Sequence, residues 1–322
     1  MERVGLELEL LAPEGKGRRA LAEKLSRALG GKLQFGLKYS SPGRAQDGRP
    51  ICELSCAYRV LDGKKRPIAT LVDDPTITIP PGLAERGDDW AGVTDDVRLA
   101  LLAERLCWAS EDTPEAVFAP LARAFDGDVE RGSERGSWGA VVDAVGHVLV
   151  KGQTLRSERA CEVVFAVMPR AAVRKTLEPW LAAAKKLGFT IPREAALHAH
   201  FDAAPFRDTA RLRRLLLTWV AQRDAWWKTL SPNPSCTQLG PPPVSVERVA
   251  RETQATLPFS TFAAALLLAG AHKACDLNVL GVIERRPRQP TLEVRCLPMS
   301  LSAKDVSASV DAAAQLLEAT AG

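Results

Sequence analysis

Apolar and acidic residues alternate near the start of the chain, in residues 4–10. Leu6, Leu8 and Leu10 take alternate positions, with Glu7 and Glu9 between them. Successive side chains of a strand point to opposite faces, so this pattern predicts a strand with one apolar face and one acidic face. Similar runs, bounded by turn-rich segments, predict further strands at residues 32–38, 51–60, 68–79, 160–168, 198–202 and 291–296.

Other stretches follow the period of an amphipathic helix. Helices are predicted at residues 18–29, 94–125, 171–187, 209–230 and 262–272, with a last helix that begins near Ser302. The stretch from residue 94 opens on a cap region and places Leu99, Leu102 and Leu106 on one apolar stripe. Residues 126–137 are expected to form a mobile surface loop, and the Pro-rich residues 231–244 a second loop.

Composition limits the class of protein. The chain has 322 residues, of which 46% are hydrophobic and 25% charged, as in globular proteins, and this excludes collagen-like and disordered classes. Its 43 Lys and Arg residues oppose 39 Asp and Glu residues, which leaves a net charge of only +4 without a run of like charges. Nucleic acid is therefore not an expected partner.

The sequence contains no segment typical of a membrane span. The longest apolar run, residues 262–271, is half of the roughly 20 residues that a span needs. The residues after Met1 lack the apolar core of a signal peptide. We therefore expect a cytoplasmic protein with no membrane partner, whose seven cysteines, none in a CxxC pair, are reduced and mostly buried.

Charged residues recur at alternate positions in three separate segments. These are Glu7 and Glu9, then His198, His200 and Asp202, and finally Glu293 and Arg295. Each set shares one face of a predicted strand, and the opposite faces are apolar. Taken singly, the acidic pair fits a solvated strand face, the histidine pair a structural role, and the Glu–Arg pair a cross-strand salt bridge.

Taken together, the three segments indicate a cation site. Carboxylates at this density repel one another, so they persist in a concave site mainly when a cation compensates them. Oxygen ligands with at most one imidazole for each ion favour Mg²⁺ or Mn²⁺ over zinc.

The same residues resemble a known family. The segments at residues 5–9, 160–164, 197–206 and 291–295 are similar to those of the putative amidoligases, which belong to the superfamily of glutamine synthetase and glutamate–cysteine ligase. The resemblance runs in the correct order from residue 5 to about residue 318. It implies an ATP-dependent carboxylate–amine ligase that uses two divalent cations.

The resemblance also implies roles for single residues. Glu7, His198 and Glu293 would hold the ion nearest the nucleotide phosphates, and Glu9 and Glu162 a second ion near the acceptor carboxylate. His200 would contact phosphate, and Arg295 would stabilise the transferred phosphoryl group. Asp202 would be a secondary ligand or would orient His200.

Further candidates have ordinary alternatives. Arg156 and Arg159 could pair with a substrate carboxylate or belong to a solvated loop. Lys273 and Asn278 could touch the nucleotide or the substrate. Glu53, and Asp74 with Thr76, could reach the site from strands or form ordinary polar strand faces.

The implied reaction is formation of an amide through an acyl phosphate, with ATP cleaved to ADP. A carboxylate on an amino acid, a peptide or a related small molecule would be joined to an amine or ammonia. The sequence has no P-loop and no GxGxxG after a strand, so the assignment of ATP rests on the resemblance alone. A phosphotransferase of the same superfamily and a non-catalytic metal- or nucleotide-binding module remain alternatives.

The expected architecture is an α+β fold of the glutamine synthetase type. A curved, mainly antiparallel sheet would form a half-barrel, with the site on its concave face and helices on its convex face. Because the site residues span the chain, residues 1–322 are expected to form one catalytic domain. Residues 83–137 are the expected peripheral insertion of helices and loops. The sequence does not identify the two substrates or the oligomeric state.

Overall fold

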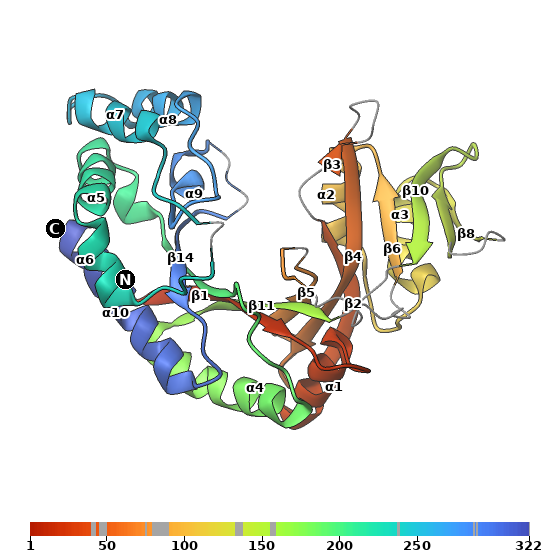
Figure 1. The fold of residues 1–322 in the computed structure, drawn as a ribbon. Helices are drawn as coiled ribbons and strands as arrows, with labels where there is room; N and C mark the ends of the chain where they lie inside the picture. The colour runs from red at the N-terminus through yellow and green to blue at the C-terminus, as the bar shows by residue number, and fades with distance from the viewer. Residues whose placement is uncertain are drawn as a thin grey trace. The chain divides into compact units, whose positions relative to one another are not determined.

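The computed structural model describes residues 1–39, 43–44, 50–74, 76–78, 90–132, 138–154, 159–236, 239–285, 287 and 289–321. The chain forms two compact units (Figure 1). The first unit contains residues 1–9, 165–185 and 191–322, and the second contains residues 10–164 and 186–190. The expectation of one catalytic domain stays a prediction.

The strands of the first unit are the ones that carry most of the predicted site. They are β1 (Arg3–Leu11), β12 (Ala196–Asp202), β13 (Leu277–Asn278), β14 (Thr291–Pro298) and the second half of β11 (Ala160–Pro169). Their order is β13-β14-β12-β1-β11, and the pairs from β13 to β1 are antiparallel. Three strands that are distant in sequence are therefore direct neighbours.

Register brings the charged positions opposite one another. Glu7 of β1 pairs with His198 of β12, and His200 pairs with Glu293 of β14. Between Leu197 and Ala199 the register of β12 and β14 shifts, so that His198 alone opposes two residues, Arg295 and Cys296. Such a bulge bends a strand and re-aims the side chains near it.

Helices cover the apolar face of these strands. The first unit contains α4 (Val173–Leu187), α5 (Thr209–Ala221), α6 (Arg223–Leu230), α7 (Val244–Glu252), α8 (Phe259–Leu268), α9 (Leu280–Ile283) and α10 (Ala303–Ala321). The last of these, α10, packs against β12 and β14. The core beneath it includes Leu6, Leu8, Leu197, Ala199, Phe201, Leu292 and Val294, all of them buried. The alternation in the sequence thus separates an apolar layer from a charged one.

Two predicted helices of this unit differ in the structure. Residues 209–230 form two helices, because the backbone at Gln222 leaves the helical region with φ −110° and ψ 14°. The helix predicted at residues 262–272 runs instead from Phe259 to Leu268. It is not buried all round, since Leu268 is 90% exposed.

The second unit contains the remaining strands and the N-terminal helix. It holds α1 (Arg18–Ala28), β2 (Lys32–Tyr39), β3 (Gly43–Arg44), β4 (Pro50–Leu61), β5 (Pro67–Val72), β6 (Trp90–Thr94), α2 (Val97–Leu106), β7 (Trp108–Ala109), α3 (Pro114–Ala124), β8 (Asp128–Arg131), β9 (Gly139–Val142), β10 (Val148–Thr154) and the first half of β11. Their order is β11-β5-β4-β6-β10-β9-β8, with β2 and β3 also paired to β4.

The strands thus form large antiparallel arrays in a mixed α and β chain. Within the described part of the chain, neither unit closes its strands into a barrel. In the same described residues, no helix combines the length and the apolar character that a membrane crossing requires.

Three predictions for the second unit need correction. The helical stretch at residues 94–125 is two helices, α2 and α3, with β7 between them. The predicted apolar stripe of α2 is also different: Leu106 is 40% exposed, and the buried residues are Leu99, Ala100 and Ala103. The predicted loop at residues 126–137 contains β8, and its residues 133–137 lie outside the described part. The predicted strand at residues 68–79 ends at Val72.

The expected insertion at residues 83–137 contains α2 and α3, as predicted for a helical region. It also contributes β6, which pairs with β4 and β10, and β8, which pairs with β9. Residues 83–89 lie outside the described part. Whether this region is peripheral stays a prediction.

Asp96 caps α2 and gives a test of this unit's stability. Its carboxylate accepts hydrogen bonds from the side chain and the backbone N–H of Arg98, which lower its pKa to about 2. Asp96→Ala is expected to lower the free energy of unfolding by about 1 kcal/mol at pH 7. Because the folded-state pKa is depressed, this difference should persist above the usual pKa of 3.8 and vanish as the pH falls toward 2.

Urea unfolding of both proteins between pH 7 and pH 2 measures this difference. Asp96→Asn is the matched control, since its amide oxygen still caps the helix but does not titrate. A difference between the wild type and Asp96→Ala that is constant over the whole pH range would contradict the assignment.

Candidate functional site

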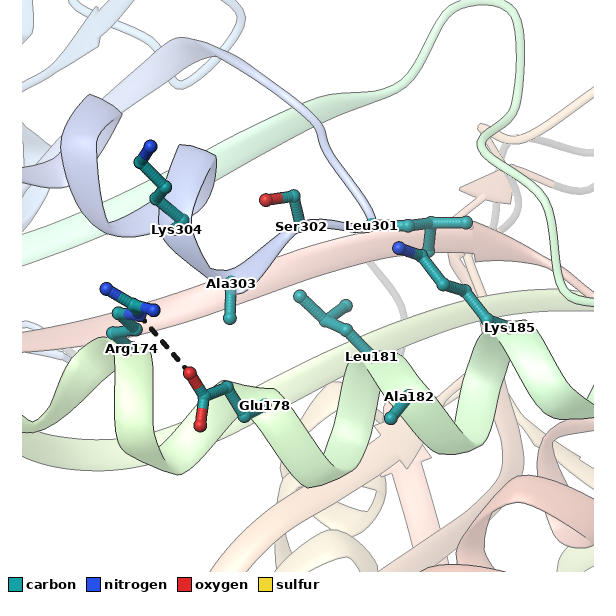
Figure 2. A pocket seen from close by; sticks show the side chains of 9 residues that line it. All are labelled: Arg174, Glu178, Leu181, Ala182, Lys185, Leu301, Ser302, Ala303 and Lys304. Carbon is teal, nitrogen blue, oxygen red and sulfur yellow. Dashed lines mark hydrogen bonds and ion pairs between the residues drawn. The ribbon is translucent and has the colours of Figure 1, made fainter.

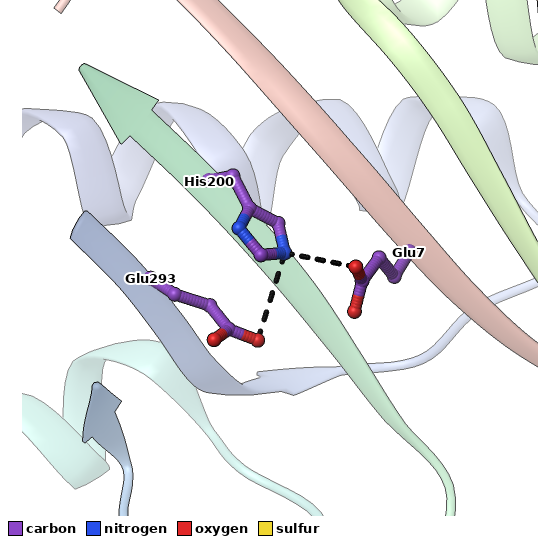
Figure 3. Close-up of side chains that lie close together, drawn as sticks. All are labelled: Glu7, His200 and Glu293. Atoms are coloured by element: carbon purple, nitrogen blue, oxygen red, sulfur yellow. Dashed lines mark ion pairs between the residues drawn. The ribbon is translucent and has the colours of Figure 1, made fainter. Parts of the chain in front are cut away.

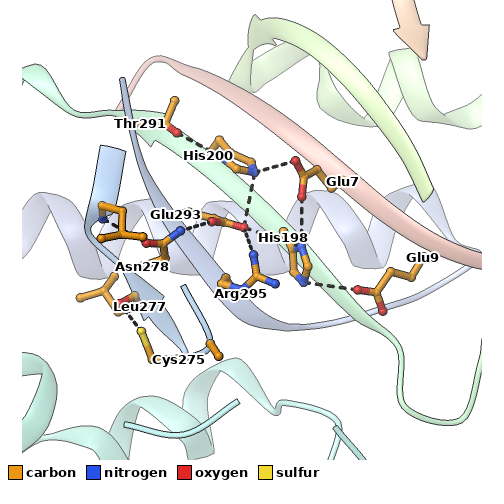
Figure 4. A network of polar contacts seen from close by, with 12 residues as sticks. Glu7, Glu9, His198, His200, Cys275, Leu277, Asn278, Thr291, Glu293 and Arg295 are labelled. Carbon is orange, nitrogen blue, oxygen red and sulfur yellow. Dashed lines mark hydrogen bonds and ion pairs between the residues drawn. The ribbon is translucent and has the colours of Figure 1, made fainter. Parts of the chain in front are cut away.

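The charged faces of β1, β12 and β14 meet on the side of the sheet away from α10 (Figure 4). Glu9, His198 and Glu293 are buried, at 7%, 5% and 5% exposure, and Glu7 and His200 are half-buried. We call Glu7, Glu9, His198, His200, Glu293 and Arg295 the charged cluster. The structure brings these six side chains together on one face of the sheet.

Glu7 lies at the centre of the charged cluster. One carboxylate oxygen, Oε2, is 3.1 Å from Nδ1 of His198, and the other, Oε1, is 3.2 Å from Nε2 of His200. Glu293 approaches the same two imidazoles from β14, with Oε1 3.6 Å from Nε2 of His200 and 3.7 Å from Nδ1 of His198. Two carboxylates on different strands therefore lie next to the same two imidazoles, and Figure 3 shows one of these, His200, between Glu7 and Glu293.

His200 is held by its other nitrogen. Its Nδ1 lies 3.1 Å from Oγ1 of Thr291, and its Nε2 is buried. That Nε2 lies between carboxylate oxygens of Glu7 and Glu293. The three ligand atoms lie within 4.8 Å of one another, as the donors of one metal ion do.

His198 and Glu9 extend the cluster along the sheet. Nε2 of His198 is 3.4 Å from Oε1 of Glu9, and Oε2 of Glu9 accepts the backbone N–H of Ala196 at 2.9 Å. His198 therefore bridges the two glutamates of β1, with both of its ring nitrogens next to carboxylates.

Glu293 also accepts hydrogen bonds from Arg295 and Asn278. Arg295 approaches it with Nη1 2.5 Å from Oε1, and Asn278 donates Nδ2–H to Oε2 at 2.6 Å. Asn278 was predicted to touch the nucleotide or the substrate, and the structure instead places it on Glu293. Lys273, predicted for the same role, is exposed in the segment before β13.

The pKa values reflect these contacts. Burial tends to raise the pKa of Glu7, but the hydrogen bonds and charges of His198 and His200 outweigh it and hold that pKa well below its usual range. Burial tends to lower the pKa of His200, and Glu7 and Glu293 reverse this and raise it. The cluster thus favours a charged Glu7.

Asp202 does not orient His200. Its carboxylate is exposed and accepts the backbone N–H of Ala204 at 2.9 Å, which caps the turn after β12. Thr291 takes the orienting role instead. Thr291, Glu293 and Arg295 alternate on one strand, so the period-two pattern that revealed the other two residues also contained Thr291.

Several predicted residues lie in the second unit. Glu162 is half-buried on β11, and its role as a metal ligand stays a prediction. Arg159 is buried and donates Nε–H to the carbonyl oxygen of Ala12 at 3.0 Å. Glu53 accepts a long hydrogen bond, 3.4 Å, from Gln153. Arg156 lies outside the described residues.

Asp74 and Thr76 are not on a strand. Because β5 ends at Val72, Asp74 falls in a turn, where its Oδ1 accepts both the backbone N–H and the hydroxyl of Thr76. This local bond accounts for the Asp-x-Thr spacing.

A separate cavity of about 320 Å³ lies between α4 and the start of α10 (Figure 2). Its floor includes Leu181 and Leu301, and Arg174 on its rim is paired with Glu178. No residue of the charged cluster lines it.

The charged cluster is expected to bind a divalent cation. Adding Mg²⁺ or Mn²⁺ at about 100 times its dissociation constant should raise the free energy of unfolding by about 2.7 kcal/mol, because the ion binds only the folded chain. Thermal unfolding with and without the ion measures this. Glu7→Gln should abolish the rise in melting temperature, and Asp202→Asn, an equal change at an exposed carboxylate, should retain it. A melting temperature that no ion shifts would refute the metal site.

Comparison with known proteins finds a matching family model and a similar solved structure. The family model described as "Putative amidoligase enzyme" matches residues 1–238. Among solved structures, the cryo-EM structure of Plasmodium falciparum glutamine synthetase is similar, with a TM-score of 0.33 and 10% sequence identity. The match covers 98% of this chain and 51% of that chain, so this chain spans about half the length of that relative. No curated protein matches the chain.

Proposed function

Because this chain belongs to the putative amidoligase family, we propose that it is an ADP-forming ligase that joins a carboxylate to an amine or to ammonia. The observation that carries the proposal is the convergence of the charged cluster from three strands. The carboxylate substrate would be an amino acid, a peptide or a related small molecule. The half-barrel fold and the cytoplasmic location predicted from the sequence belong to this proposal.

The reaction must overcome the poor reactivity of a carboxylate. In the first step a carboxylate oxygen attacks the γ-phosphorus of ATP, the bond to the β-phosphate breaks, and ADP leaves. In the second step the amine nitrogen attacks the acyl carbon, inorganic phosphate leaves with its bonding electrons, and the nitrogen loses a proton. No covalent bond to the enzyme is required, in keeping with the absence of a GxSxG motif from the sequence.

The charged cluster fits a divalent cation of the Mg²⁺ class. Its donors are carboxylate oxygens and one imidazole nitrogen, Nε2 of His200, which is buried between Glu7 and Glu293. Glu7, Glu293 and His200 would hold the ion. A bound ion would neutralise the phosphate charge that gathers in the transition state.

This ligand set differs in one residue from the set that the resemblance implies. His198 is also close to Glu7 and Glu293, but both its ring nitrogens lie beside carboxylates. We favour His200 because Thr291 already orients its Nδ1, and because its Nε2 faces Glu7 and Glu293, the two carboxylates that would hold the same ion. His198 and Glu9 would serve a second ion, and the role of Glu162 as a metal ligand stays a prediction from the sequence.

Arg295 is proposed to stabilise the transferred phosphoryl group. Its guanidinium lies on the charged face beside Glu293 and is partly accessible, with 19% of its side chain exposed. Fixed positive charge at this point would act on charge that moves in the transition state. The alternative is a purely structural salt bridge with Glu293.

Substitution of Arg295 separates these two roles. Arg295→Ala is expected to lower turnover by a factor of about 10² to 10³ while the affinity for ATP changes less. Arg295→Lys should restore little, since an ammonium does not reproduce the planar fork of a guanidinium. The measurement is amide formation and nucleotide binding, with Glu293→Gln beside them. Wild-type turnover in Arg295→Ala would support the structural salt bridge.

The direct test of the function is ATP cleavage screened against amino acids, peptides and amines with Mg²⁺. A ligase forms ADP and an amide in equal amounts. ADP with a phosphorylated acceptor and no amide would identify a phosphotransferase, and nucleotide binding without turnover would identify a binding module.

A further inference from the structure

Asp276 is a fully buried carboxylate outside the charged cluster, in the segment just before β13. Its Oδ1 accepts the indole N–H of Trp219 at 2.9 Å. Its Oδ2 accepts Nε–H of Arg223 at 2.7 Å and the indole N–H of Trp227 at 3.1 Å. We call Asp276 and these three donors the Asp276 cage.

The three donors come from one side of a pair of consecutive helices. Trp219 lies on α5, and Arg223 and Trp227 lie on α6, at intervals of four residues. The guanidinium of Arg223 also stacks over the ring of Trp227, at 4.0 Å from its centroid. Both oxygens of Asp276 are engaged, so the carboxylate cannot rotate without losing a bond.

The backbone of Asp276 leads directly to the charged cluster. Its carbonyl oxygen accepts the backbone N–H of Arg295 at 2.9 Å, and its own N–H donates to Gly240 at 2.8 Å. Two residues further on, Asn278 holds Oε2 of Glu293. The segment 276–278 therefore contacts both residues that β14 contributes to the cluster.

We propose that Asp276 is a positioning residue, whose cage fixes segment 276–278 and through it the orientation of Glu293 and Arg295. The inference rests on the proposed function, since it assigns to Asp276 a part in the same site. The strand β14 has a bulge at Arg295 and Cys296, where the regular ladder does not fix the direction of a side chain. The hydrogen bond from Arg295 to Asp276 lies at this bulge.

The chemistry of the cage supports a positioning role. An ionised carboxylate is costly to bury and is retained only where hydrogen bonds and a counter-charge compensate it. An apolar residue at position 276, beside the two indoles, would avoid the free-energy cost of burying a carboxylate. The carboxylate instead fixes the orientation of its segment, because three donors converge on its two oxygens.

Two neighbouring tryptophans provide a matched test. Trp227→Phe removes one donor from Asp276, whereas Trp226→Phe removes an indole N–H that donates to Gln222 at 3.1 Å. Mn²⁺ is titrated into each variant and into the wild type, and the free ion is followed by electron paramagnetic resonance. Trp227→Phe is expected to weaken Mn²⁺ binding about ten-fold or more, and Trp226→Phe less than about two-fold. Asp276→Asn, which turns an N–H toward the donors, should weaken it at least as much as Trp227→Phe.

Hydrogen exchange at the backbone N–H of Arg295 gives a second readout that needs neither metal nor activity. Exchange should be faster in Trp227→Phe than in the wild type and unchanged in Trp226→Phe. If the wild type cleaves no ATP with any acceptor, the proposed function fails, and these two readouts still decide the role of Asp276. Equal Mn²⁺ affinity and equal exchange in the two tryptophan variants would overturn the positioning role, because both changes then act only on helix packing.

Discussion

Two carboxylates that face the same imidazole nitrogen are the constraint on which the rest of the site depends. Oε1 of Glu7 and Oε1 of Glu293 lie 3.2 and 3.6 Å from Nε2 of His200, on a sheet face where water screens them little. Their repulsion must be offset by donors and positive charge. His198, Arg295 and Asn278 supply these, each from a separate strand. The same arrangement gathers carboxylate oxygens and an imidazole nitrogen close enough to hold one divalent cation.

Strand alternation explains why the carboxylates stay together despite their electrostatic repulsion. Leu6 and Leu8 on one side of β1 are buried in the layer beneath α10, so Glu7 has no other face to occupy. A shift of β1 by one residue against β12 would drive Glu7 and Glu9 into that layer and turn Leu6 and Leu8 out of it. Burial of the apolar side chains therefore fixes the register of β1, and the register fixes the face on which the acidic side chains lie.

The period-two patterns predicted the strands of the site and the faces of their side chains, because those depend on local alternation. They did not predict the bulge opposite His198, which depends on how β12 and β14 meet. They did not predict the Asp276 cage either, since Trp219 and Trp227 fit an ordinary buried helix face. The sequence patterns predicted that Asp74 lies on a strand and that Asp202 is a metal ligand or orients His200. In the structure each carboxylate accepts the backbone N–H of the residue two positions further on, Thr76 and Ala204 respectively.

The family match does not reach the residues that β14 and the segment 276–278 contribute to the site. The family match covers residues 1–238, which include Glu7 and His200, whereas Glu293, Arg295 and Asp276 lie beyond it. Those three depend on the pairing of β14 with β12 and on the bonds from segment 276–278. A chain that kept only the matched part would retain acids and imidazoles but lose Arg295, the guanidinium to which we assign a role in the proposed phosphoryl transfer. The pairing of β14 with β12 thus brings Glu293 and Arg295 to the acids and imidazoles of β1 and β12, and so completes the charged cluster on which the proposed function rests.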